Sequence, residues 1–363
     1  MSKLLVLINL LVIFLDVFAQ PIGNDLISVV VLHRHGDRAP VKAYKNDPYA
    51  DESYWPLGFG ELTNIGKKQQ YGLGKWLRER YVDFLPVSYN KNDIKIHSSN
   101  VDRCLMSAES NVAGLYPPEG NQVWNDQLKW QPIPIHTTPK TEDAILAQSK
   151  PCSKYSKLLK ELMEEEPFNS TLDKYKEQMD YFSKNSGENI TTLVDLMDLY
   201  NTVYIENLHN LTQPDWTQSL LTEEIEQLSG LAWSAYAYTQ DLARLRSGPL
   251  IDLILNHFEN VKNNVEDTPK FLMLSGHDST IAPLLTAMQV YDNKWPYYAS
   301  SVIFELREGK NNDFVNVFYR NPTEIANITL PSCDFDCDFD NFQKVLAPVR
   351  TSLEDWNKEC QQE

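Results

Sequence analysis

The stretch Val29–Pro40, with the sequence VVVLHRHGDRAP, constrains the fold of this chain more than any other. Its valine-rich first half predicts a β-strand covered on both faces, and its second half is a polar loop. Open α/β sheets bind ligands at the carboxyl ends of their strands. In the loop, Arg34 and Arg38 flank His35, and guanidinium groups hold oxyanions through paired hydrogen bonds. A histidine there is either a further cation or, if it stays neutral, a nucleophile, so the stretch predicts phosphate chemistry.

Two later segments repeat the order of strand, polar residues and helix start. Residues 93–98 alternate as a strand and precede a helix predicted over 102–113. Residues 270–275 form an apolar strand pattern, followed by Gly276-His277-Asp278 and another helix. If these strands are parallel neighbours, the three polar sets meet at one sheet edge beside helix N-termini, which favour anions.

The remaining patterns predict an α/β core with a helical insertion. A helix is expected over 63–80, and residues 302–319 alternate around a central turn as a hairpin. Residues 124–139 are rich in proline and predict irregular structure. Residues 152–247 are polar, charged and helical in pattern. We therefore expect an open sheet flanked by helices, with core segments at about 20–125 and 250–363 and a helical cap at about 126–249.

The N-terminus predicts export from the cytosol. Leu4–Leu15 is apolar apart from Asn9, follows Lys3 and precedes a small residue, Ala19, which together describe a signal peptide of residues 1–19. The apolar run is shorter than the ~20 residues of a membrane span, so no anchor is expected. Four acceptor sequons predict glycosylation at Asn169, Asn189, Asn210 and Asn327. We expect a secreted protein, with a soluble lysosomal destination as the alternative.

The net charge excludes some classes of partner, and the cysteine content bears on disulfide formation. The formal net charge of −17 argues against nucleic acid or anionic membranes as partners. Of the five cysteines, four should pair in an oxidising compartment and one should remain free. Cys333 and Cys337 are close enough to close a small loop, although their spacing could also suit a metal site. No histidine lies near them, and the compartment favours a disulfide.

Arg34–Pro40 resembles the RHGxRxP signature of the histidine acid phosphatases, a branch of the phosphoglycerate-mutase-like superfamily. Asn100–Ala108 is similar to the segment that carries the family's third phosphate-binding arginine, and His277-Asp278 resembles its HD motif. The resemblance covers essentially the whole mature chain and is strongest to the animal prostatic and lysosomal members. It implies a phosphoglycerate-mutase-like fold, no cofactor and no metal.

The resemblance also implies a role for each site residue. His35 would attack phosphorus and form a phosphohistidine, and Asp278 would protonate the leaving alcohol. The phosphoryl oxygens would be held by Arg34, Arg38, Arg103 and His277. Neighbouring cations should lower the pKa of His35, whereas a bound phosphate should raise the pKa of Asp278 and keep it protonated.

The family pattern further implies the disulfides Cys152–Cys360 and Cys333–Cys337, which leave Cys104 free as a small buried side chain. Other histidines have no partners at metal-ligand spacing, and we interpret them as structural or exposed: His97, His136, His209 and His257. Asp37 is expected to orient the catalytic loop or to cap it.

The sequence therefore predicts a secreted acid phosphatase that hydrolyses phosphate monoesters. Its expected substrate is a small phosphomonoester or a phosphoprotein, and homodimers are common in the family. One alternative is a selective, phytase-like inositol-phosphate phosphatase, which a basic cap would favour, but the cap is rich in acidic residues. The other alternative is a secreted binding protein that has lost catalysis, which would show damage at the histidine or arginine positions.

Overall fold

The computed structural model describes residues 25–361, so the predicted signal peptide lies outside the described residues. A central sheet has the strand order β3-β2-β4-β1-β5-β6-β7, with β8 paired to β6. The first four strands in this order are parallel and the others are antiparallel. The strands are β1 (Leu26–Arg34), β2 (Ile94–Ser99), β3 (His136–Thr138), β4 (Phe271–Gly276), β5 (Ser301–Arg307), β6 (Phe314–Arg320), β7 (Ile325–Ile328) and β8 (Cys337–Asp338).

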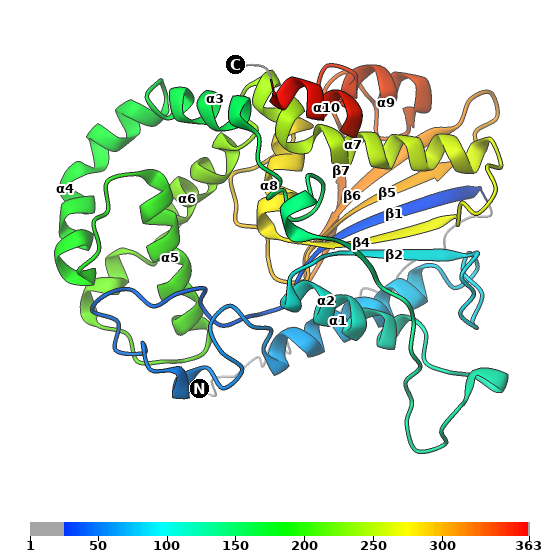
Figure 1. Cartoon of the computed structure of the whole chain (residues 1–363), viewed down its shortest axis with the longest axis horizontal. Helices are drawn as coiled ribbons and strands as arrows, with labels where there is room; N and C mark the ends of the chain where they lie inside the picture. The colour runs from blue at the N-terminus through cyan, green and yellow to red at the C-terminus, as the bar shows by residue number, and fades with distance from the viewer. Residues whose placement is uncertain (1–24, 362–363) are drawn as a thin grey trace, which may run out of the picture.

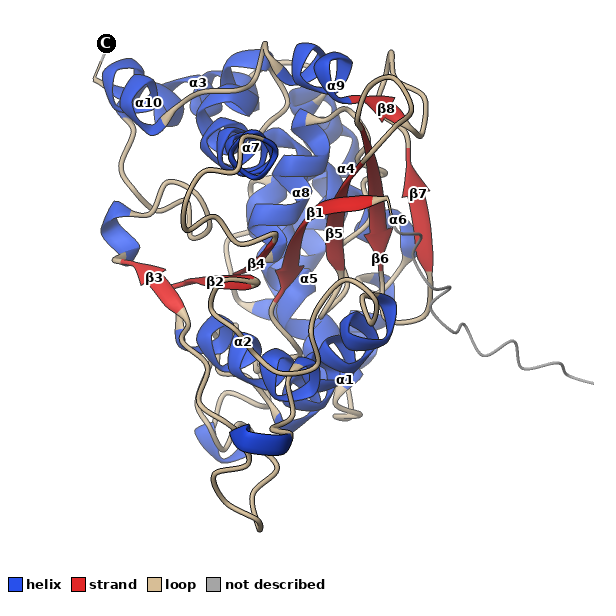
Figure 2. Ribbon diagram, turned by 90° about the vertical axis from the view of Figure 1, so that its right-hand side faces the viewer, coloured by secondary structure: helices blue, strands red, loops and turns tan. Residues whose placement is uncertain are grey.

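Helices cover both faces of this sheet, as the view along it shows (Figure 2). Val29 and Val31 of β1 pack on one face against α1 (Asn64–Arg80) and α2 (Asp102–Leu115). Val30 and Leu32 point to the other face, where they meet apolar residues of the remaining core helices. Those helices are α7 (Gln240–Lys262), α8 (Asp278–Ala287) and α9 (Phe339–Leu346). The four side chains are fully buried, which explains why β1 reads as an unbroken apolar run.

A helical lobe lies beside one end of the sheet (Figure 1). It contains α3 (Ser153–Met163), α4 (Phe168–Ser186), α5 (Leu193–Leu208) and α6 (Glu223–Ala235), and α10 (Leu353–Cys360) packs near α3. Short 3-10 turns occur at Glu52–Tyr54, Gly120–Gln122, Lys140–Glu142 and Asp215–Ser219. Two apolar clusters hold the lobe together, and the second also includes Ala282 of α8. The predicted α/β fold, with an open sheet flanked by helices, is confirmed.

One local expectation was wrong. The segment expected to be irregular contains β3, because His97–Ser99 of β2 offers a free strand edge to His136–Thr138. Near the end of the segment 152–247, which is helical as expected, Thr239 accepts a hydrogen bond from the Leu242 amide and begins α7 as a new helix after α6. α7 then runs without interruption past residue 249, where we placed the core–cap boundary; that domain division stays a prediction.

Two disulfides are present, Cys152–Cys360 and Cys333–Cys337. The first joins the start of α3 to the end of α10 across 208 residues of sequence, whereas the second spans four. Within residues 25–361, none of the helices combines the length and the apolar character needed to cross a bilayer.

Replacing both Cys152 and Cys360 by serine is expected to lower the free energy of unfolding by roughly 2–5 kcal/mol, because a long loop regains its entropy in the unfolded chain. Denaturant unfolding of the oxidised protein measures this change. The matched control replaces Cys333 and Cys337 by serine, which opens only a short loop and should cost much less. Equal losses in the two variants would contradict the loop-entropy explanation.

Candidate active site

The strand order brings the three polar segments to one edge of the sheet. β4 lies between β2 and β1, and both neighbours are parallel to it, with Ser98 opposite Ser275 and Arg34 opposite Gly276. The polar residues after each strand therefore meet at the carboxyl end, where α2 and α8 begin. The predicted convergence is confirmed, and the lobe closes over this edge (Figure 1).

Arg34 and Asp278 form the deepest ion pair of the site. Arg34 Nη2 lies 2.6 Å from Asp278 Oδ2, and the arginine is only 2% exposed. Arg34 Nη1 also donates to the carbonyl oxygen of Pro296 at 2.5 Å. The guanidinium carbon lies 4.0 Å from the centre of the Tyr298 ring, which forms a cation–π contact. A carboxylate, a carbonyl oxygen and an aromatic ring thus stabilise the positive charge of Arg34.

His35 is buried in its neutral form. Its Nδ1 donates to the carbonyl oxygen of Gly36 at 2.8 Å, so the proton is on Nδ1 and Nε2 keeps a lone pair. Burial lowers the pKa of His35 well below its usual range, and the charges of Arg103 and Arg34 lower it further. The expected direction of this shift agrees with the structure, although burial rather than the cations is the larger cause.

The other three predicted residues are close to His35, and two of them line a cavity of about 310 Å³. Arg38 and Arg103 line the cavity together with Asp278. His277 lies beside Arg103, with its Nδ1 3.4 Å from Nη2, and its Nε2 is 2.9 Å from Ser99 Oγ. Burial and the charge of Arg103 lower the pKa of His277 to about 3, so this ring is also neutral. The structure thus brings all six residues together: Arg34, His35, Arg38, Arg103, His277 and Asp278.

The pKa of Asp278 in the free site is shifted in the opposite direction from the one we expect when phosphate is bound. Burial raises the pKa of this carboxyl, but the charges of Arg34 and Arg38 outweigh burial and lower the pKa to about 2. Without an anion in the site, Asp278 is therefore ionised and paired with Arg34. The expected rise depends on a phosphate group that competes for the same arginines.

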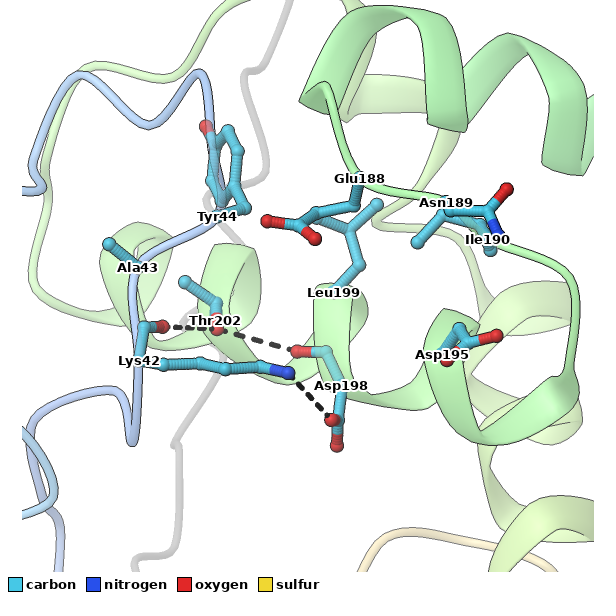
Figure 3. Close-up of a pocket in the computed structure, with 10 residues that line it drawn as sticks. All are labelled: Lys42, Ala43, Tyr44, Glu188, Asn189, Ile190, Asp195, Asp198, Leu199 and Thr202. Carbon is cyan, nitrogen blue, oxygen red and sulfur yellow. Dashed lines mark hydrogen bonds and ion pairs between the residues drawn. The ribbon is translucent and has the colours of Figure 1, made fainter.

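Helix α5 contributes several contacts that sequence reasoning missed. Arg38 Nη2 donates to Asn201 Oδ1 at 2.9 Å, and Thr202 Oγ donates to the carbonyl oxygen of Lys42 at 3.1 Å. Lys42 Nζ also pairs with Asp198 Oδ2 at 3.2 Å (Figure 3). At the end of the helix, His209 Nε2 is 2.9 Å from the buried carboxylate of Asp37.

Our interpretation of His209 as merely structural or exposed therefore missed a contact with the catalytic loop. The lobe and that loop meet through side chains about 160–170 residues apart in sequence. No local pattern could have revealed these pairs.

The other predicted residues have simpler surroundings. Cys104 is a free, fully buried thiol 3.5 Å from His277 Nε2, and burial raises its pKa to about 12. The four sequon asparagines are exposed, and their glycosylation stays a prediction. His33 is fully buried in β1, and burial lowers its pKa to about 4. Among residues 25–361, no group of three or more His, Cys, Asp or Glu side chains has the arrangement of a metal site.

Comparison with known proteins decides the family. A model of the histidine phosphatase superfamily (branch 2) matches residues 25–320. The chain belongs to branch 2 of this superfamily. The lysosomal acid phosphatase of Xenopus laevis is 38% identical over 364 residues, covering 98% of this chain and 83% of that protein. The prostatic acid phosphatase of Bos taurus is 38% identical over 345 residues, covering 93% and 88%.

Solved structures share the fold. The apo form of Hafnia alvei phytase aligns with a TM-score of 0.70 at 16% identity, covering 95% of this chain and 100% of that chain. At this identity the match bears on the fold alone. The predicted family and the predicted enzyme class, an acid phosphatase that hydrolyses phosphomonoesters, are confirmed by the similar sequences.

A buried carboxyl pair lies behind the contact between α5 and the catalytic loop. Glu206 of α5 is fully buried and lies close to the carboxyl group of Asp47, which is 9% exposed. The hydroxyl-bearing rings of Tyr44 and Tyr49 lie close to the pair. Burial and the charge of Asp47 raise the pKa of Glu206 from 4.5 to about 8. The folded protein therefore holds a proton at Glu206 that the unfolded chain would release.

This shift predicts that the protein is more stable in acid. Because the folded-state pKa is the higher one, the stabilisation is complete below pH 4.5 and is lost as the pH rises towards about 8. Glu206→Gln mimics the protonated form and should remove this loss, which leaves the variant roughly 5 °C more stable than the natural protein at pH 8. Melting temperatures measured across this range test the effect. Glu188→Gln, at an exposed position, is the matched control. A difference in melting temperature between Glu206→Gln and the natural protein that does not change with pH would contradict the assignment.

Proposed function

We propose that the protein is a secreted acid phosphatase that hydrolyses phosphate monoesters through a phosphohistidine at His35. The observation that carries this proposal is the neutral His35 with a free Nε2 lone pair beside three arginines. Phosphoryl transfer requires positioning and neutralisation of the equatorial oxygens, which guanidinium groups can supply without a metal ion. Arg34, Arg38 and Arg103 would hold those oxygens, with His277 as a further partner.

The first half of the reaction forms a nitrogen–phosphorus bond and breaks the bond to the leaving oxygen. Nε2 of His35 attacks phosphorus in line with the leaving group. The incoming phosphate competes for Arg34 and Arg38, so it weakens the charges that keep Asp278 ionised. Asp278 can then bind a proton in mild acid and transfer it to the leaving oxygen.

The second half of the reaction releases phosphate. A water molecule attacks phosphorus while Asp278, now a carboxylate, accepts its proton. The bond to Nε2 breaks, and His35 returns to its neutral form. The same two side chains therefore serve both steps, with Asp278 alternating between acid and base.

The surroundings of the cavity favour substrates of low charge. Asp198 lines it on the lobe side, and Glu188 and Asp195 line a smaller neighbouring pocket that shares Lys42 and Asp198 (Figure 3). Because Asp198 is paired with Lys42, Glu188 and Asp195 are the carboxylates that would repel a substrate with many phosphate groups, which argues against a phytase-like specificity. The six site residues are all present and close together, which argues against a binding protein without catalysis.

Rapid quenching tests the nucleophile. With a labelled aryl phosphate and EDTA present, the natural protein should give label that is stable to base, labile to acid and located on the peptide containing His35. His35→Ala should lose turnover by roughly 10³-fold or more and should trap no label. His257→Ala removes a histidine outside the site and should leave both unchanged. Label on another peptide would show that a different nucleophile is used, and loss of activity with EDTA would show that a metal is required.

Export can be tested separately from catalysis. Expression of the full chain in a eukaryotic secretory host should deliver the protein to the medium, with Gln20 as its first residue. N-terminal sequencing and treatment with an N-glycosidase measure the cleavage site and the sugar. Retention of an uncleaved protein inside the cells would contradict the secreted location.

A further inference from the structure

The proposed proton donor has a second side-chain partner that the mechanism above does not use. Trp295 Nε1 donates to Asp278 Oδ2 at 3.4 Å. The same oxygen lies 2.6 Å from Arg34 Nη2, and the other carboxylate oxygen accepts from the amide of Ser279 at 2.8 Å. An indole nitrogen can only donate, so this contact favours the charged form of the carboxyl.

Trp295 is held firmly by other aromatic rings. Its ring meets Trp233 edge to face at 5.6 Å and stacks on Tyr200 at 5.8 Å with an interplanar angle of 29°. Trp295 also lines the catalytic cavity. The next residue, Pro296, accepts a hydrogen bond from Arg34, so one short segment contacts both members of the Arg34–Asp278 pair.

Substrate binding would change which of these partners holds the Asp278 carboxyl in place. A phosphoryl group between the arginines competes with Asp278 for Arg34. The carboxyl then depends on its remaining donors for its orientation, and the Trp295 N–H is the one that comes from a packed side chain. Because an N–H bonds more strongly to a carboxylate than to a neutral acid, the contact gains strength as Asp278 loses its proton to the leaving group.

We propose that Trp295 is a positioning residue that fixes the Asp278 carboxyl for proton transfer to the leaving oxygen. The inference rests on the proposed role of Asp278. In the step concerned, the bond between phosphorus and the leaving oxygen breaks, and the proton of Asp278 moves to that oxygen. Trp295 exchanges no proton and stabilises the carboxylate that the transfer creates.

A pair of aryl phosphates separates this role from a structural one. Nitrophenolate leaves readily as an anion, whereas the phenolate of phenyl phosphate is more basic and depends more on protonation. Trp295→Phe keeps a ring but removes the donor. We expect kcat/KM for phenyl phosphate to fall about tenfold, and that for p-nitrophenyl phosphate to fall about twofold or less.

Trp233→Phe is the matched control, because it changes the neighbouring indole, whose nitrogen has no hydrogen-bond partner among the described residues. This variant should show no dependence on the leaving group. Equal losses on both substrates in Trp295→Phe, or the same selective loss in both variants, would overturn the inference.

Asp278→Asn separates failure of this inference from failure of the proposed function. A selective loss on phenyl phosphate in Asp278→Asn, without one in Trp295→Phe, would reject only the role of Trp295. No selectivity in Asp278→Asn would show that Asp278 is not the proton donor, and the role of Trp295 would fall with it, whereas the His35 nucleophile is judged separately by the phosphohistidine trap. The phosphohistidine trap in Trp295→Phe should still label His35, which confirms that the nucleophile is intact.

Discussion

Arg34 carries a permanent positive charge into the interior, where its side chain is almost inaccessible to water. An unpaired charge there would be strongly destabilising, so the surrounding chain must supply negative or polar partners. Asp278, the Pro296 carbonyl and the Tyr298 ring provide them from α8 and from the segment before β5. This requirement ties the end of β1 to two distant parts of the sequence. In the proposed mechanism, an incoming phosphate competes for the same ion pair.

The second structural theme is the contact between α5 and the catalytic loop. Asn201 holds the side chain of Arg38, and His209 holds Asp37 one residue earlier in the loop. Both loop residues are buried, so a shift of the lobe would change the position of the Arg38 guanidinium, which we propose binds phosphate. The lobe is therefore part of the active site and helps to hold its geometry. The buried pair Asp47 and Glu206 lies at the same contact between α5 and the loop. Because Glu206 titrates, we expect the stability of this contact to depend on pH.

Burial and charge divide the two proposed catalytic side chains into different protonation states. His35 is neutral because burial and its cationic neighbours both disfavour a further positive charge. Asp278 is ionised in the free site because the arginines outweigh burial. In the proposed reaction, a bound phosphate monoester would weaken the effect of the arginines on Asp278, so that this carboxyl could bind a proton, while His35 would stay neutral. The site can therefore present a nucleophile and an acid under the same mildly acidic conditions.

The sequence by itself determined the parts of this protein that depend on local pattern. The apolar run before His35, the helix start at Arg103 and the His277-Asp278 pair predicted three strands that each end in polar residues before a helix or loop, because side-chain periodicity is a local property. The tertiary structure made these strands parallel neighbours, so that their polar ends meet. The tertiary structure alone decided which residues complete the site. Asn201, His209 and Trp295 reach it because the lobe and the segment before β5 pack across the sheet edge, and packing between distant segments leaves no signal in a single sequence. It also set the ionisation of Asp278, since that depends on how closely Arg34 approaches in three dimensions.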